Sequence, residues 1–92
     1  MPSERVHTVD LLDQGIAALQ KLGYQLRIEP ELGQSSVCEL KGKPWLILDP
    51  NQAPREQLHV VLDALRREPA LGSRVALSAE LLRTLQFQAR AA

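Results

Sequence analysis

The chain is poor in the residues that support covalent cross-linking, base stacking and membrane insertion. It holds one cysteine, Cys38, so an internal disulfide and a zinc site built on several cysteines are both excluded. Aromatic residues make up 3% of the chain, too few for a platform that stacks nucleic-acid bases. Apolar runs such as residues 45–48 are far shorter than the roughly 20 residues of a membrane span.

Charge of one sign is also lacking, because 11 Lys and Arg balance 11 Asp and Glu. No long-range field therefore attracts phosphate polymers or anionic membrane surfaces, and we expect neither nucleic acid nor membrane as a partner. Residues 1–5 lack the basic and apolar segments of a secretory signal. We expect a soluble protein in the cytoplasm.

The size and composition predict one small folded domain over residues 1–92. The chain is 45% hydrophobic and 24% charged, which is ordinary globular usage, and two separate cores would each be too small to be stable. We expect the ends, residues 1–7 and 88–92, to be frayed.

Hydrophobic periodicity predicts a first helix over residues 8–22, with Val9, Leu12, Ile16 and Leu19 on one stripe. Gly23 follows at the position where a left-handed residue ends a helix. A second helix is predicted from Pro54 to the residues before Pro69, with apolar residues at Leu58, Val61, Leu62 and Leu65. A third helix begins after Ser78, a good N-cap, and carries Leu81 and Leu85.

Three short strands are predicted between the first two helices. Residues 24–28 alternate apolar and polar, residues 36–40 form a second strand, and residues 45–48 are apolar on both faces. The last pattern is typical of a strand that is covered on both sides or central in its sheet. The predicted fold is α+β: a helix, a three-stranded antiparallel meander and two further helices, with the helices packed on one face of the sheet.

Residues that could carry chemistry are few. His59 and Asp63 are four residues apart on the second predicted helix, so their side chains can meet, but two ligands leave a metal site incomplete and a solvated pair is the simpler interpretation. Cys38 suits a small buried hydrophobe, and as a nucleophile it would need His7 or His59 as a base. No glycine-rich phosphate loop is present. We assign no catalytic residue, metal ligand or cofactor.

A strand that ends in Leu48-Asp49-Pro50, followed by Pro54-Arg55-Glu56-Gln57-Leu58 at the start of an apolar helix, resembles the ImmA/IrrE type of small zincin metallopeptidase domain. The resemblance covers residues 46–67. Where that family has His-Glu-x-x-His, this chain has Asp63-Ala64-Leu65-Arg66-Arg67. Neither zinc-binding histidine nor the general-base glutamate is present, so the resemblance implies a catalytically silent relative and carries over no functional residue.

The leading functional hypothesis is a non-catalytic module that binds a partner protein or a second copy of itself. A short sheet has two edges whose unpaired backbone groups accept an added strand. The candidate interface residues are Tyr24, Leu26, Val37 and Trp45, although Trp45 also fits a core position. The alternatives are a small enzyme that uses Cys38 or a His59/Asp63 site, and a degenerate metallopeptidase-like domain.

Overall fold

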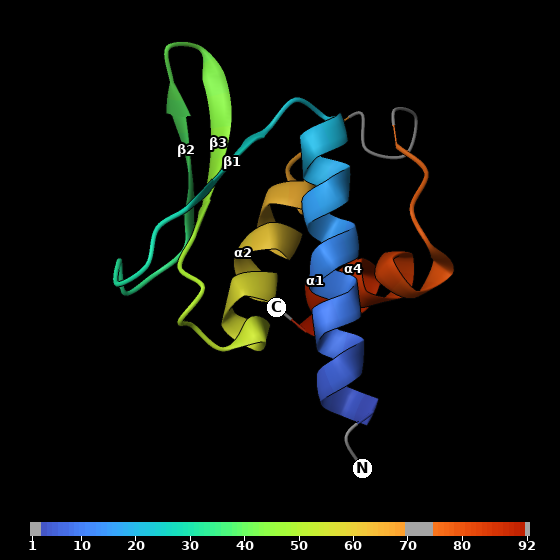
Figure 1. Ribbon diagram of the computed structural model, residues 1–92. Coiled ribbons are helices and arrows are strands. Elements are labelled where there is room, and N and C mark those ends of the chain that lie inside the picture. The colour runs from blue at the N-terminus through green and yellow to red at the C-terminus, as the bar shows by residue number, and fades with distance from the viewer. Residues whose placement is uncertain (1–2, 70–74, 92) are drawn as a thin grey trace.

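The computed structural model describes residues 3–69 and 75–91. Its elements follow the order α1 (Ser3–Lys21), β1 (Gln25–Ile28), β2 (Ser36–Leu40), β3 (Lys43–Leu48), α2 (Pro54–Arg66) and α4 (Ala79–Ala91). The three helices lie on the same side of the three-stranded sheet (Figure 1). An α+β fold is therefore confirmed, with helices and strands in the predicted order.

Both terminal helices extend into the segments that we expected to be frayed. Helix α1 begins at Ser3 and helix α4 continues to Ala91. Residues 1, 2 and 92, which also belong to those segments, lie outside the described residues. None of the helices in the described part of the chain is long and apolar enough to cross a membrane.

Helix α1 buries a stripe that is shifted from the predicted one. Leu12 and Leu19 are buried as expected, but Val9 is 41% exposed and Ile16 is only partly buried. Their places in the core are taken by Leu11, Ala18 and Leu22. Because α1 packs mainly against α2, the contact with that helix, rather than hydrophobicity alone, decides which residues face inward. Gly23 ends the helix with φ of 106°, as predicted.

The predicted antiparallel meander is wrong, because the sheet is mixed and its order is β1-β3-β2. Strands β2 and β3 pair antiparallel, whereas β1 pairs with β3 in parallel. The tight turn between Leu40 and Lys43 makes β2 and β3 direct neighbours. The connection from β1 to β2 spans residues 29–35, which is long enough to leave room for β3 between the two strands.

A buried carboxylate holds that connection against the end of β3. Asp49 is 2% exposed and accepts hydrogen bonds from the backbone N–H groups of Gly33 at 2.7 Å and Asn51 at 2.9 Å. The Asp49 N–H donates to Ser35 Oγ at 3.0 Å, and that hydroxyl donates to Gln52 Oε1 at 2.6 Å. These bonds tie the segment before β2 to the segment after β3, and so fix where β2 begins.

The two faces of the sheet have different surroundings. Leu46 and Leu48 in β3 are buried in the core with α1 and α2. Side chains alternate along a strand, so Trp45 and Ile47 project to the face opposite the helices, and both are half-buried. The register places Cys38 opposite Trp45 and Val37 opposite Leu46. Val37 therefore faces the helices and Cys38 faces away from them.

The two later helices begin as the sequence predicts. Pro54 is the first residue of α2, whose buried face includes Leu58, Val61, Leu62 and Leu65. Ser78 caps α4, because its Oγ accepts a hydrogen bond from the Leu81 N–H at 3.1 Å. Leu81 and Leu85 are buried, which joins α4 to the same core.

Helices α1 and α2 approach each other closely at a glycine. A Cβ atom placed on Gly15 would lie 2.5 Å from Val61 Cγ1, well inside van der Waals contact. Val61 is fully buried and β-branched, so in a helix it has essentially one side-chain rotamer and little freedom to withdraw. Gly15 therefore sets the distance between the two helices.

We expect the Gly15→Ala substitution to lower the free energy of unfolding by about 1–2 kcal/mol. Alanine favours a helix over glycine by roughly 1 kcal/mol, whereas overpacking a core costs about 1–3 kcal/mol. Because the distance to Val61 is short, we expect an overpacking cost at the upper end of that range. Urea unfolding followed by circular dichroism measures the change.

A double-mutant cycle with Val61→Ala tests the cause. The double variant should be more stable than the sum of the single changes predicts, because the truncated side chain makes room for the new methyl group. A Gly15→Ala protein more stable than the parent would contradict the close approach.

Candidate functional site

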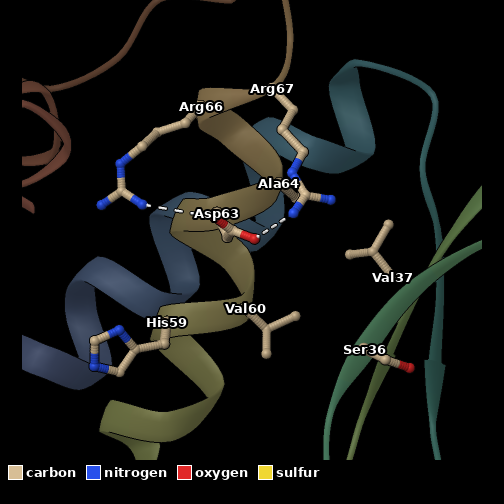
Figure 2. Close-up of a pocket in the computed structure, with 8 residues that line it drawn as sticks. All are labelled: Ser36, Val37, His59, Val60, Asp63, Ala64, Arg66 and Arg67. Carbon is tan, nitrogen blue, oxygen red and sulfur yellow. Dashed lines mark ion pairs between the residues drawn. The ribbon is translucent and has the colours of Figure 1, made fainter. Parts of the chain in front are cut away.

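A groove of about 420 Å³ lies between helix α2 and the edge strand β2 (Figure 2). Its apolar part comes from Val37 of β2 and from Val60 and Ala64 of α2. The remaining lining residues are polar or charged: Ser36, His59, Asp63, Arg66 and Arg67. The groove thus combines an apolar floor with a charged rim, beside backbone that is free to pair.

The charges of the rim are organised around one carboxylate. Asp63 pairs with Arg67, one turn further along α2, at 2.9 Å, and lies 4.0 Å from Arg66. The Arg67 side chain lies on the β2 side of the helix, close to Val37, whereas Arg66 and His59 project toward the opposite side (Figure 2). Arg66 Nε also approaches the Leu85 carbonyl oxygen of α4, at 3.4 Å. Of the two arginines, Arg67 is therefore the one directed toward β2.

The outer edge of β2 presents unpaired backbone groups. Lys41 and Gly42 have φ of 53° and 78°, which defines a two-residue type I′ turn whose flanking residues, Leu40 and Lys43, form a hydrogen-bonded pair. Such pairs alternate along an antiparallel ladder, so the N–H and C=O of Val37 and Glu39 point away from β3. Pro44, which lacks an N–H, is the partner of Glu39 and fits this alternation.

Glu39 adds a negative charge to the same edge. Its side chain is on the helix-facing side of β2, as is that of Val37, because the two residues are two positions apart. Glu39 is exposed and forms no ion pair with any residue that the structure describes. Along β2, the edge therefore presents Arg67 beside Val37 and a free carboxylate two residues further on.

The four candidate interface residues do not form one surface. Val37 is 36% exposed and lines the groove, whereas Trp45 lies on the opposite face of the sheet. Leu26 packs against the core and Tyr24 is partly buried beside it. Of the four, Val37 alone lies at the groove. The strands that carry Leu26 and Val37, β1 and β2, are nevertheless both edge strands, because β3 is central.

Tyr24 has a structural partner just beyond the C-terminal end of α2. Its hydroxyl donates a hydrogen bond to Glu68 Oε2 at 3.1 Å, which links the start of β1 to the segment after α2. Burial raises the pKa of Tyr24 above its ordinary value of 10.0, and the Glu68 carboxylate raises it further, while Arg67 acts in the opposite direction. The phenol is therefore held in its neutral form.

The residues of the enzymatic alternative are placed apart. Cys38 is partly buried on the face of β2 that points away from the groove, and so from His59. His7 lies on α1 and pairs with Glu80 of α4 at 3.2 Å. Neither histidine is thus arranged as a base for the thiol.

The predicted contact between His59 and Asp63 is replaced by the contact of Asp63 with the two arginines. Among the described residues, no three His, Cys, Asp or Glu side chains gather in a way that could hold a metal ion.

Arg66 and Arg67 are charged site residues that sequence reasoning missed, since it considered them as part of the segment that replaces the His-Glu-x-x-His motif. A signal was present: Val60, Ala64 and Arg67 follow the spacing i, i+4, i+7 and thus share one face of the helix. What the sequence lacked was the knowledge that this face lies next to an edge strand, which depends on the strand order.

Comparison with protein-family models, with curated proteins and with solved structures finds no match to this chain. The groove must therefore be interpreted from its own geometry and charge.

The raised pKa of Tyr24 predicts a loss of stability in alkali. The folded state keeps the phenolic proton at a pH where the unfolded chain releases it, so this contribution is complete below pH 10.0 and is lost as the pH rises through the folded pKa. Tyr24 is the only tyrosine, so ultraviolet absorbance of the phenolate measures its titration directly.

Two variants separate the causes of this shift. Tyr24→Phe should lower stability at neutral pH by about 1 kcal/mol and should weaken the alkaline decline. Glu68→Gln should reduce the shift without removing it, because burial is the larger cause. A phenol that titrates at its ordinary pKa in the folded protein would contradict the placement of Tyr24.

Proposed function

We propose that this protein is a non-catalytic protein-binding module that takes up an extended segment of its partner as an added strand on β2. The observation that carries the proposal is the groove itself. An apolar floor lies directly beside the outward N–H and C=O groups of Val37 and Glu39. Backbone hydrogen bonds would supply affinity, and the groove would receive alternate side chains of the ligand.

Two features of the edge support strand addition. Edge strands are commonly protected by charged side chains, proline or a bulge; β2, with the sequence Ser-Val-Cys-Glu-Leu, has neither proline nor a bulge, and Glu39 is its single charge. Its apolar residues Val37 and Leu40 are 36% and 54% exposed. An added strand would cover both its backbone and part of this apolar surface. Strand β1 is shorter and does not line the groove, so β2 is the better candidate.

Binding is favoured over catalysis by the distribution of reactive groups. Cys38 and His59 lie on opposite sides of β2, and Asp63 is engaged by Arg67. Nothing in the groove pairs a nucleophile with a base, as covalent catalysis requires. The proposal includes a second copy of the chain as the partner, if that copy contributes an extended segment to the contact.

Val37→Pro tests the role of the edge. Proline removes the outward N–H and places its ring where the ligand backbone would lie, without removing a bond to β3. Peptides selected against the wild-type protein from a displayed random library should bind the variant about tenfold more weakly, or not at all. Val37→Ala, which keeps the N–H, is the matched control and should retain most of the affinity.

Thermal unfolding of both variants checks that the fold is intact. Selected peptides that bind equally to the wild type and to Val37→Pro would exclude β2 as the binding edge. A selection that yields no binding peptides would count against the module itself.

A degenerate metallopeptidase-like domain is the second proposal. It is favoured by one observation. Asp63 and Arg67 stand at the positions of the two histidines of the ImmA/IrrE motif and Ala64 stands at the position of its glutamate, and all three residues line the groove. The ion pair between Asp63 and Arg67 would then occupy the place of the lost zinc ligands.

Restoring the motif tests this second proposal. The triple variant Asp63→His, Ala64→Glu, Arg67→His should bind zinc with micromolar or tighter affinity, measured by competition with a chromogenic chelator. The single variant Asp63→His is the control and should bind no more zinc than the parent. A triple variant that behaves like this control would contradict the kinship.

A further inference from the structure

We propose that the segment bound along β2 carries a basic residue and, two positions later, an acidic residue, so that the module recognises Lys-x-Glu in an extended strand. This inference rests on the proposed function and specifies the chemistry of the partner. It follows from the register of the edge and from the charges that stand beside it.

The outward backbone groups fix the register. Val37 and Glu39 can each form a hydrogen-bonded pair with one residue of an added strand, because the N–H and C=O groups of both point away from β3. Side chains of directly opposed residues lie on the same face of a sheet. The ligand residues opposite Val37 and Glu39 therefore project to the helix-facing side, into the groove and its continuation along the edge.

The charges beside those two positions are opposite in sign. At Val37 the groove holds Arg67, which is directed toward the strand (Figure 2) and is paired with Asp63 on one side. Asp63 contacts Arg67 through Nη2, so further donors of the guanidinium remain for a ligand. An acidic side chain fits opposite Val37. Glu39 offers an unpaired carboxylate, so a basic side chain fits opposite it.

Strand direction orders the two charges along the ligand. Antiparallel pairing is slightly more stable than parallel pairing, and in it the ligand residue opposite Glu39 precedes the residue opposite Val37 by two positions. The ligand thus reads basic, any residue, acidic from its N-terminus. Its intervening residue projects to the other face, beside Cys38 and Trp45, where an apolar side chain is favoured.

Three blocked peptides test the order of charges. They are Thr-Val-Lys-Val-Glu-Val-Thr, the reversed Thr-Val-Glu-Val-Lys-Val-Thr and the neutral Thr-Val-Gln-Val-Gln-Val-Thr, each titrated into the full chain and followed by amide chemical shifts. The first peptide should bind about two- to fivefold more tightly than the neutral one, the range of exposed ion pairs. This advantage should shrink with added salt.

Two variants of the protein locate the charges. Arg67→Gln should reduce the advantage of the first peptide over the neutral one to the part that the pair between the peptide lysine and Glu39 supplies, whereas Arg66→Gln, the matched control with the same loss of charge, should largely retain the full advantage. Glu39→Lys should reverse the preference at the first charged position, so that a peptide with glutamate at both positions becomes the tighter ligand.

The outcomes separate this inference from the proposed function. Equal binding of all three peptides, or a preference for the reversed one, would overturn the Lys-x-Glu assignment while leaving strand addition in place. Failure of all three peptides to bind would count against strand addition on β2 itself. An advantage that Arg67→Gln leaves undiminished would likewise overturn the assignment.

Discussion

The site depends on the buried carboxylate of Asp49. A carboxylate withdrawn from water is stable only when strong hydrogen bonds replace its hydration, and here the bonds come from Gly33 before β2 and Asn51 after β3. The acceptor thereby joins two loops that are distant in sequence. With the loop before β2 held at the end of β3, β2 pairs with β3 along one side only. The other side remains an open edge next to α2, and the groove arises there.

The sequence predicted the elements well because each has a local signal. Gly23, Pro54 and Ser78 act within a few residues, and all three mark helix boundaries found in the structure. Strand order has no comparable signal, since it depends on pairing between segments that are far apart. One indication was available: residues 45–48 are apolar on both faces, which predicts a central strand, whereas a meander places residues 36–40 at the centre. The structure follows the apolar pattern.

The candidate site was less predictable than the fold, for the same reason. Val37 was a candidate interface residue although the predicted meander places its strand at the centre of the sheet. Its neighbours Val60, Ala64 and Arg67 come from α2 and its C-cap, and only the observed strand order brings β2 beside that helix. Trp45 was considered for an interface without knowledge of which face it occupied. Sidedness in a sheet is a consequence of register, and register was the property that local patterns could not supply.

One face of the sheet is covered by helices and the other is not, and the single tryptophan and the single tyrosine lie in these two different environments. The single tryptophan, Trp45, lies on the face away from the helices, and the single tyrosine, Tyr24, lies against the segment that follows α2. Tryptophan emission therefore senses the environment of the open sheet face, while the tyrosine hydroxyl senses whether the end of α2 remains docked on β1. The wild-type chain thus carries a separate optical signal for each of its two layers, without any added label.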